Sequence, residues 1–276
     1  MNLSSNLLES AALGATVVAA SAAALSALLG GYLIFLIVAA AFGPARKSVC
    51  GSQKTRFAIL VPAHNEMLLI GRLIRSLQAQ AYPRELFDIF VVADNCSDAT
   101  ATIARGVGAT VLERFDHTQM GKGFALRWLL QHLSSGYGEY DAYVVFDADS
   151  VVTEGFLSAM DARLERGASV VQGYYSVLNA NDSPLAMLRF AALASLHYLR
   201  PLAREALGLS CGLKGNGMCF CADVLHRIGW QWFTLAEDVE FHLALVREGI
   251  RVHFAWDARV DADMPVTFGQ AVSQNA

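Results

Sequence analysis

The sequence contains few charged residues, and the deficit is concentrated near its amino terminus. Asp, Glu, Lys and Arg together make up 17% of the 276 residues, whereas soluble domains contain about 25%. Residues 10–45 carry no charged side chain at all. The length suits one domain of about 200 residues together with an additional segment, and the uncharged stretch is the candidate for that segment.

Runs of basic residues are missing as well. The net charge is −4 and no long stretch of Lys and Arg occurs, which argues against nucleic acid as a partner. The five cysteines are odd in number, and Cys219 and Cys221 are separated by a single residue, which is not a usual zinc-binding spacing. We therefore expect free thiols in a reducing compartment.

Several signatures of nucleotide-using enzymes are also absent. No G-x-G-x-x-G turn follows the first predicted strand, which argues against a nicotinamide-binding Rossmann domain. No Walker A pattern follows that strand either. A phosphatase with an aspartyl nucleophile would carry its paired aspartates after the first strand, whereas here they follow the fourth. These absences narrow the enzyme classes that remain.

Residues 17–41 form an apolar run that is long enough to cross a membrane. A helix of that length covers about 37 Å, against about 30 Å for the hydrocarbon core of a bilayer. Glu9 is the only charged residue before it, so the basic region of a cleaved signal peptide is missing. A buried helix of a soluble domain is rarely so uniformly apolar. We expect residues 1–16 to be an amino-terminal tail and residues 17–41 to be a retained transmembrane anchor.

Basic residues follow the predicted anchor. Arg46, Lys47 and Lys54 lie within residues 42–54, which we interpret as a basic linker. Positively charged flanks favour the cytoplasmic side of a membrane. The sequence therefore predicts a single-pass protein of the inner or plasma membrane, with the domain that follows the anchor in the cytoplasm.

Strand and helix patterns alternate from residue 55 onward. Apolar runs typical of strands occur at residues 57–61, 87–93, 109–112, 143–146 and 169–177. Helical spacing occurs at residues 67–80, 99–107 and 122–133, in two stretches within 154–210, and from about 234 to 248. This alternation predicts an α/β domain over residues 55–276, with a mostly parallel central sheet and helices on both faces.

Polar residues cluster where three of the predicted strands end. These clusters are Pro62-Ala63-His64-Asn65-Glu66, Asp94-Asn95-Cys96-Ser97-Asp98 and Asp147-Ala148-Asp149. In parallel sheets, ligands bind outside the carboxyl ends of the strands. Helix capping explains one such cluster, but it does not explain three along one edge. We therefore expect a binding site at this edge.

The pair Asp147 and Asp149 predicts the chemistry of that site. Two carboxylates directly after a buried strand repel each other unless positive charge lies between them. Mg²⁺ or Mn²⁺ most often supplies this charge, because these ions prefer hard oxygen ligands. Such ions in turn bind diphosphates. The segment therefore predicts a metal ion and a nucleotide.

Two further segments carry candidate residues in the second half of the chain. Residues 211–218 contain three glycines, which allow a tight turn and close approach of the backbone to a ligand, although a structural turn explains them too. Glu237 and Asp238 open the last predicted helix. Acidic residues in a first turn stabilise the helix dipole, so this pair alone does not establish a catalytic role.

The order of these motifs resembles that of the family 2 glycosyltransferases, particularly the membrane-bound cellulose-synthase-like group. The matching segments are Val61-Pro62-Ala63-His64-Asn65-Glu66, Asp94-Asn95-Cys96-Ser97-Asp98, Gly121-Lys122-Gly123 with Ala125-Leu126, Asp147-Ala148-Asp149, Gly215-Asn216-Gly217 and Glu237-Asp238. Each motif is weak alone, but six in this order are specific. The resemblance covers about residues 55–276 and implies an A-type glycosyltransferase fold and inverting transfer from a nucleotide-sugar.

The resemblance also implies roles for individual residues. The expected nucleotide-sugar-binding residues are Pro62, His64, Glu66, Asp94, Asn95, Lys122, Asp147, Gly215 and Asn216. Asp147 and Asp149 would hold Mg²⁺ or Mn²⁺ and the diphosphate. Asp238 matches the general base of the family, with Glu237 beside it in the catalytic motif. UDP is the nucleotide that the resemblance favours, whereas the sugar stays open, as does the choice of a glycan or a lipid as acceptor.

One departure from the family pattern concerns the carboxyl end. Processive relatives carry a Gln-x-x-Arg-Trp motif after the last strand. Gln274 matches its first residue, but the Arg and Trp do not follow, nor do the later transmembrane helices of the family. We expect a truncated chain, which leaves processivity and acceptor binding open.

Two rival functions remain at this point. A nucleotidyltransferase also uses a parallel sheet with metal-binding aspartates, but it would carry a Gly-rich basic loop after its first strand, which residues 62–66 do not supply. The other rival is a membrane-anchored pseudoenzyme or assembly subunit that binds a nucleotide-sugar without turnover. Assays with a panel of nucleotide-sugars separate these possibilities.

Overall fold

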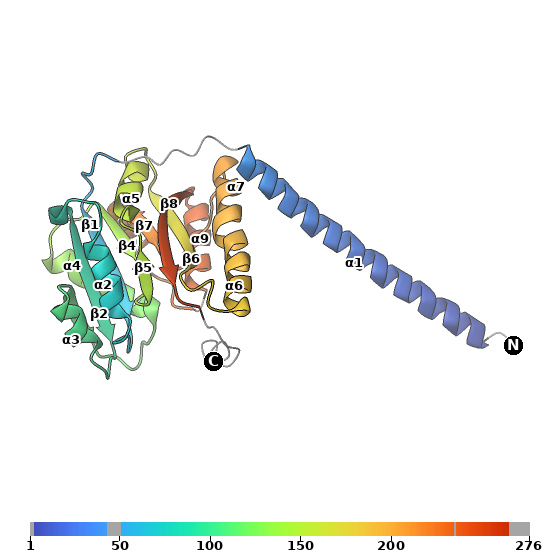
Figure 1. Cartoon of the computed structure of the whole chain (residues 1–276), viewed down its shortest axis with the longest axis horizontal. Helices are drawn as coiled ribbons and strands as arrows, with labels where there is room; N and C mark the ends of the chain where they lie inside the picture. Colours follow the sequence, from blue (N-terminus) through green and yellow to red (C-terminus); the bar gives the residue numbers. More distant parts are fainter. Residues whose placement is uncertain (1–2, 43–50, 235, 265–276) are drawn as a thin grey trace.

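A computed structural model of the chain describes residues 3–42, 51–234 and 236–264. Figure 1 shows a long helix, α1 (Leu3–Ala41), that projects from an α/β domain. Arg46, Lys47 and Cys50 lie outside the described residues, as do Leu235 and Gln274. The predictions for the first part of the linker and for the carboxyl end therefore stay predictions.

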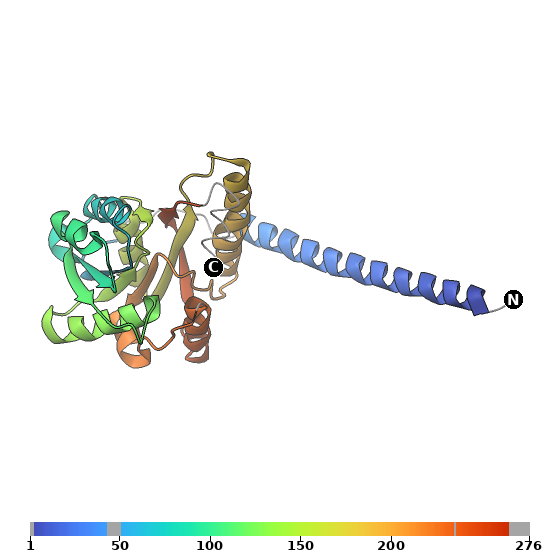
Figure 2. The ribbon, with the colours of Figure 1, turned by 90° about the horizontal axis from the view of Figure 1, so that it is seen from below.

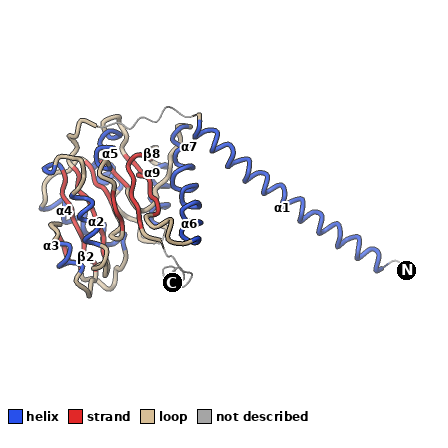
Figure 3. Tube along the Cα trace, in the orientation of Figure 1, coloured by secondary structure: helices blue, strands red, loops and turns tan. Residues whose placement is uncertain are grey.

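The domain is built on one sheet of eight strands within the described part of the chain. The strands are β1 (Phe57–Ala63), β2 (Phe87–Asp94), β3 (Thr110–Arg114), β4 (Ala142–Val145), β5 (Ser150–Val152), β6 (Val170–Val177), β7 (Met218–Cys221) and β8 (Val252–Ala262). Their order across the sheet is β3-β2-β1-β4-β7-β6-β8-β5. Figure 3 shows the sheet between layers of helices.

The sheet has a parallel half and a mixed half. Strands β3, β2, β1 and β4 are parallel neighbours, and β6 also runs parallel to β8. In contrast, β7 is antiparallel to both β4 and β6, and β5 is antiparallel to β8. The predicted parallel order therefore holds for the half that carries the predicted site, while the other half is less parallel than expected.

Helices cover both faces of the sheet, as predicted. They are α2 (Ile70–Gln78), α3 (Thr100–Gly106), α4 (Lys122–Gly136), α5 (Phe156–Leu164), α6 (Pro184–Ala194), α7 (Arg200–Ala206), α8 (Ala222–Ile228) and α9 (Glu237–Arg247). A 3₁₀ turn spans Arg84–Leu86, and a π-helical turn, Ser195–Leu199, joins α6 to α7.

The two faces of the sheet form two apolar cores because side chains alternate along each strand. In β1, Phe57 and Ile59 belong to the core under α2 and α5, whereas Ala58 and Leu60 belong to the core under α4 and α9. All four residues are fully buried. Apolar packing on both faces thus holds the sheet, including the carboxyl ends of its strands, where the site is predicted.

Helix α1 contacts the domain only near its carboxyl end. Leu36 and Ala40 are buried in the same core cluster as Leu202 and Ala203 of α7. Figure 2 shows the rest of α1 extending away from the domain, and its apolar side chains are largely exposed. Residues 13–41 are long and apolar enough to cross a membrane, judged by length and composition alone.

Some predicted boundaries move in the structure. The helix expected at 67–80 begins only at Ile70, because residues 66–69 form a turn tied to the next loop. There the backbone N–H of Met67 donates to Asp98 Oδ2 at 3.1 Å, and that of Glu66 donates to Thr100 Oγ1 at 2.7 Å. Gly249 follows α9 in the left-handed region with φ of 71°, as expected for a residue that ends a helix.

Candidate active site

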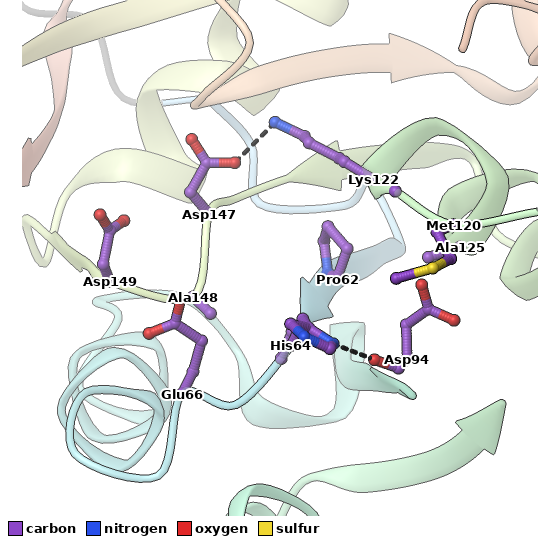
Figure 4. Close-up of a pocket in the computed structure, with 12 residues that line it drawn as sticks. Pro62, His64, Glu66, Asp94, Met120, Lys122, Ala125, Asp147, Ala148 and Asp149 are labelled. Carbon is purple, nitrogen blue, oxygen red and sulfur yellow. Dashed lines mark hydrogen bonds and ion pairs between the residues drawn. The ribbon is translucent and has the colours of Figure 1, made fainter. Parts of the chain in front are cut away.

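The carboxyl ends of β1, β2 and β4 surround a cavity of about 540 Å³. The register of the sheet explains this arrangement, since Ala63 at the end of β1 lies beside Ala93 near the end of β2. Figure 4 shows the residues that line the cavity. They are Pro62, Ala63, His64, Glu66, Asp94, Met120, Gly121, Lys122, Ala125, Asp147, Ala148 and Asp149. The three polar clusters that the sequence predicted are therefore brought together.

The loops after β1 and β2 are tied to each other on one side of the cavity. His64 Nδ1 donates a hydrogen bond to the backbone oxygen of Asp94 at 2.7 Å (Figure 4). Asn65 takes a left-handed backbone conformation with φ of 55°, and its Oδ1 accepts from the backbone N–H of Ser97 at 2.8 Å. Left-handed conformations outside glycine are uncommon and cluster at functional sites. These bonds hold the His64 ring at the rim of the cavity.

A buried ion pair fixes Asp94. Arg114, at the end of β3, donates to Asp94 Oδ1 at 2.6 Å, and the side chains are 4% and 8% exposed. The same guanidinium contacts Asp116 at 3.0 Å and the backbone oxygen of Gln119 at 2.8 Å. Sequence reasoning missed Arg114, although its position two residues after a predicted strand was a usable signal. One Asp94 oxygen is thus occupied, and the carboxylate is held in a single orientation.

Asn95 lies beside the cavity but does not line it. Its side-chain amide donates to the backbone oxygen of Asp116 at 3.0 Å, and its Oδ1 accepts from the Asp116 N–H at 2.8 Å. Asn95 is buried and has a φ of 51°. In the structure, the Asn95 side chain thus connects the loops after β2 and β3 by hydrogen bonds.

Lys122 occupies the centre of the opposite wall. Its Nζ donates to Asp147 Oδ1 at 2.6 Å and to the backbone oxygen of Gly215 at 2.6 Å, and it lies 3.9 Å from Glu237 Oε1. Burial opposes the charge, but the neighbouring carboxylates outweigh it and raise the pKa of Lys122. Gly215 has a φ of 78°, a conformation that glycine adopts without strain. The sequence predicted a metal ion as the positive partner of the aspartates, and the structure adds a lysine on Asp147.

Asn216 positions the loop that carries Asp147. It is fully buried, and its amide donates to Ser150 Oγ at 2.8 Å while its Oδ1 accepts from the backbone N–H of Asp147 at 3.2 Å. Its hydrogen-bonding groups are therefore used within the protein. Gly215 and Asn216 are not among the residues that line the cavity, and their direct contact with the nucleotide-sugar stays a prediction.

Carboxylates gather at the deep end of the cavity. Burial and the charge of Asp147 raise the pKa of Asp149, and burial and the charge of Asp149 raise the pKa of Glu66. This excess negative charge suits a divalent cation with oxygen ligands. Within the described residues, no three His, Cys, Asp or Glu side chains are placed to hold a metal together. Asp147 and Asp149 fit a cation whose remaining ligands are water and substrate oxygens, as is usual for Mg²⁺.

Glu237 and Asp238 open α9 next to Lys122. Burial, Asp147 and Asp238 raise the pKa of Glu237 to about 7 against the opposing effect of Lys122. The approach is close: a Cβ atom added to Gly123 would lie 2.3 Å from the Trp232 carbonyl oxygen and 2.9 Å from Glu237 Oε2. Only glycine therefore lets the first turn of α4 pack against this segment, which explains the second glycine of Gly121-Lys122-Gly123. Asp238 is half-buried in the same first turn.

Two residues near the aspartates gave no signal in the sequence. The rings of Tyr175, in β6, and His197, in the π-helical turn, stack at 5.3 Å between centroids. Burial together with Asp147 and Asp149 raises the pKa of Tyr175. Burial and nearby Lys214 lower the pKa of His197 to about 4. Both residues thus lie within electrostatic range of charged groups at the site.

Comparison with known proteins gives one matching family. The model of the glycosyltransferase-like family 2 matches residues 55–276. Probable glycosyltransferase YdaM of Bacillus subtilis (strain 168) is 24% identical over 212 residues, which are 72% of this chain and 48% of that protein. Beta-monoglucosyldiacylglycerol synthase of Trichormus variabilis (strain ATCC 29413 / PCC 7937) is 29% identical over 195 residues, 68% of this chain and 40% of that protein. The chain thus spans about half or less of the length of these relatives.

A solved structure shares the fold. Mannosyltransferase PcManGT from Pyrobaculum calidifontis, in complex with GDP-Man and Mn²⁺, aligns with a TM-score of 0.68 and 19% identity. The alignment covers 92% of this chain and 70% of that chain. The architecture predicted from the sequence, a domain of the A-type glycosyltransferase fold, is confirmed.

Proposed function

Because this chain belongs to the glycosyltransferase-like family 2, we propose that it transfers a sugar from a nucleotide-sugar to a glycan or lipid acceptor with inversion at the anomeric carbon. The observation that carries the proposal is the cavity at the carboxyl edge of the parallel half-sheet. Its walls combine a nucleoside-sized space with a lysine and a carboxylate cluster. Family membership and this cavity support one function, sugar transfer from an activated donor.

The nucleoside of the donor binds between the ends of β1 and β2 in this proposal. Pro62 and His64 form one wall, and Asp94, held by Arg114, supplies its free carboxylate oxygen to a hydroxyl or N–H of the nucleoside. Asn95 keeps the loop around Asp94 in place. A preformed acceptor of this kind lowers the cost of ordering the site when the ligand binds.

The diphosphate lies toward Asp147 and Asp149. These two carboxylates would hold Mg²⁺ or Mn²⁺, which when bound supplies positive charge to the leaving diphosphate. Lys122 already lies at Asp147 and adds a fixed positive charge at the same place. Asn216 accepts a hydrogen bond from the backbone of Asp147, and Gly215 accepts one from Lys122, so both groups are held in position. PcManGT was solved with GDP-Man and Mn²⁺, which supports a metal here as well.

Asp238 is the general base of the proposed reaction. An acceptor hydroxyl has far too high a pKa to attack unaided, and a positioned carboxylate that takes its proton contributes about 10²- to 10⁴-fold in rate. Direct displacement with one base inverts the anomeric carbon, and no carboxylate nucleophile is required. Glu237 faces Lys122 on the donor side, so we assign it to positioning that lysine.

The acceptor reaches the site from the membrane in this proposal. Helix α1 supports anchoring, because residues 13–41 are long and apolar enough to span a bilayer. The Trichormus variabilis relative is a beta-monoglucosyldiacylglycerol synthase by name, which supports a lipid acceptor. The basic residues after α1 favour the cytoplasmic side for the domain, where nucleotide-sugars are made.

The test is a donor panel with a metal control. The full chain is incubated with UDP- and GDP-sugars and a membrane lipid extract, and products are detected by mass. We expect transfer from one nucleotide class, and we expect that nucleotide to raise the melting temperature more with Mn²⁺ than without it. Asp149→Ala should remove the additional increase in melting temperature that Mn²⁺ produces. Equal stabilisation with and without metal in the wild type would refute the metal site, and binding without transfer from any donor would favour a pseudoenzyme.

A further inference from the structure

Lys214 is a half-buried lysine that no carboxylate contacts in an ion pair within the described part of the chain. Among the residues that the structure describes, its Nζ makes no hydrogen bond or ion pair, although its backbone N–H donates to Gln172 Oε1 at 2.8 Å. Buried lysines are normally paired, because removing an ammonium from water is costly. Burial and nearby Arg200 lower the pKa of Lys214. The surroundings of Lys214 therefore suit an anion that the protein itself does not supply.

The side chains near Lys214 belong to basic residues. A Cβ atom added to Gly212 would lie 3.8 Å from Lys214 Nζ and 3.7 Å from the ring of His242, so the lysine and the histidine converge on one point. His242 Nε2 is hydrogen-bonded to Ser210 Oγ at 2.9 Å. Arg204 Nε donates to the backbone oxygen of Ser210 at 2.6 Å. We call Lys214, Arg200 and Arg204 the cation cluster.

The cation cluster has a surplus of positive charge. Arg200 and Arg204 lie four residues apart on α7 and therefore on one face of it, and neither pairs with a carboxylate in the described part of the chain. Glu205, the acidic residue of α7, is engaged by Arg251 at 2.9 Å and by His253 at 3.0 Å.

Asp238 is the carboxylate that acts on this cluster from α9. Its charge counteracts the lowering of the Lys214 pKa, and it precedes His242 by four residues, so both lie on one face of the helix. Three cations thus face one carboxylate. Lys122, by contrast, lies at Asp147 on the donor side. The surplus positive charge therefore acts on Asp238, the proposed general base.

Exposed apolar side chains precede the cation cluster along the same helical run. In α6 and the π-helical turn, the side chains of Met187, Leu188 and Leu196 are 46%, 68% and 47% exposed. The same helical run continues into α7, where Arg200 is exposed. Leu36 and Ala40 of α1 pack in the core cluster that includes α7, and Figures 1 and 2 show α6 and α7 on the side of the domain from which α1 projects. The exposed apolar side chains and Arg200 thus belong to one helical run, whose α7 contacts the candidate membrane helix.

We propose that the cation cluster binds an anionic group, a phosphate or a carboxylate, on an amphiphilic acceptor whose apolar part lies along α6. The proposal rests on the proposed function, since it places the acceptor hydroxyl at Asp238 and its anionic group at Lys214. It narrows the substrate class from any glycan or lipid to anionic lipids. Neutral lipids such as diacylglycerol leave Lys214 without a counter-ion and are the poorer acceptors.

Direct binding tests the proposal without turnover. The full chain in phosphatidylcholine nanodiscs is titrated calorimetrically with octyl phosphate, octyl glucoside and inorganic phosphate. Hydrogen bonds to charged groups are worth about 10- to 100-fold in affinity, so Lys214→Met should weaken octyl phosphate binding by about that factor, whereas Arg200→Gln, at an exposed position, should weaken it about 2- to 5-fold. Arg247→Gln is the matched control, because Arg247 is exposed at the far end of α9, and it should leave binding unchanged. Arg200 is exposed, so its replacement tests the cluster even where Lys214→Met impairs folding.

Each outcome decides the proposal. Preference for octyl phosphate over octyl glucoside that is weakened in both cluster variants supports it. Equal affinity for octyl phosphate in the wild type and in the two variants overturns it. Binding of inorganic phosphate as tight as that of octyl phosphate overturns the lipid part and assigns the cluster to a soluble anion.

The donor panel separates this proposal from the proposed function. Loss of phosphate binding in the variants, in a chain that transfers no sugar, would refute the proposed function and keep the anion site. Transfer to phosphatidylglycerol, an anionic lipid with a free hydroxyl, at the same rate in the wild type and Lys214→Met, with an unchanged KM for the donor, would refute the anion site and keep the glycosyltransferase.

Discussion

Lys122 is the residue at which the donor half of the site meets the catalytic helix. Its ammonium is shared by the Asp147 carboxylate and the Gly215 carbonyl, with Glu237 at 3.9 Å. Glu237 is therefore a more distant partner of a lysine that already has two hydrogen-bond acceptors. The effect of burial on Glu237 consequently outweighs the attraction of Lys122, and the pKa of Glu237 rises to about 7. In neutral solution this carboxyl group is poised between its two protonation states.

The titration of Glu237 predicts a pH-dependent stability difference. Its folded pKa of about 7 lies above the ordinary value of 4.5, so its stabilising contribution is complete below about pH 4.5 and is lost as the pH rises through 7. Glu237→Gln mimics the neutral form at every pH. The melting temperature of the variant relative to the wild type should therefore increase by several degrees between pH 5 and pH 8, measured by differential scanning fluorimetry. A constant difference across this range would contradict the raised pKa.

The positions of site residues could be predicted from the sequence where these residues directly follow a strand. Asp147 and Asp149 follow a buried strand directly, and His64 and Asp94 follow two others, so their common edge could be predicted. The contact of Lys122 with Asp147 could not, because it joins residues of two elements whose distance depends on packing. The predicted contacts of Asn95 and Asn216 with the ligand stay predictions. The hydrogen bonds of their amide groups to the backbone of neighbouring loops follow from no local pattern.

At the scale of elements, the ends of β2 and β3 are joined by the buried pair of Asp94 and Arg114. Removing one partner of a buried ion pair leaves an uncompensated charge and costs about 3–5 kcal/mol. Arg114→Met should therefore destabilise the domain by about this amount and weaken nucleotide binding, as measured by urea unfolding and by the nucleotide-induced melting shift. Arg105→Met is the control, because its pair with Glu113 is 49% and 38% exposed and such pairs contribute about 0–1 kcal/mol. Equal effects of the two variants would show that Asp94 does not depend on Arg114.

The elements themselves were predictable in the parallel half of the sheet and less so beyond it. Strands β1, β2 and β3 and helices α3 and α4 lie close to their predicted ranges, because each has strong apolar periodicity. Strand β5 has only three residues, too few for a period to appear. The eleven-residue β8 was not predicted, and its pairing with β6 contains a register shift. The direction in which β7 pairs with its neighbours is set by tertiary packing, so no pattern within the strand predicts it.

At the scale of the whole molecule, the carboxyl end of α1 packs against the domain, and the rest of α1 exposes apolar side chains. Leu36 and Ala40 are buried against the core cluster of α7, while Leu25 and Leu28 are 60% and 70% exposed. A lone helix with this exposed apolar surface is stable in a bilayer and is a liability in water. In the proposed membrane-anchored state, the contact of α1 with α7 brings the proposed acceptor surface to the membrane.

Membrane anchoring through α1 predicts a fractionation result. The wild-type chain should stay in the membrane pellet after alkaline carbonate extraction. A charged residue at mid-span costs about 2.5–3.5 kcal/mol, so Leu25→Arg combined with Leu28→Arg should release the chain to the supernatant. The matched pair Leu25→Ile and Leu28→Ile should stay in the pellet. Release of the wild type would contradict the anchor.

The central claim is that Asp238 removes the proton of the acceptor during sugar transfer, and its replacement tests this most directly. With the donor identified by the panel, transfer by Asp238→Asn is compared with that by the wild type and by Glu240→Gln, a control in the same helix. The account predicts a loss of about 10²- to 10⁴-fold in kcat for Asp238→Asn, with donor binding nearly unchanged and the control fully active. Turnover by Asp238→Asn at the wild-type rate would contradict the assignment of the base.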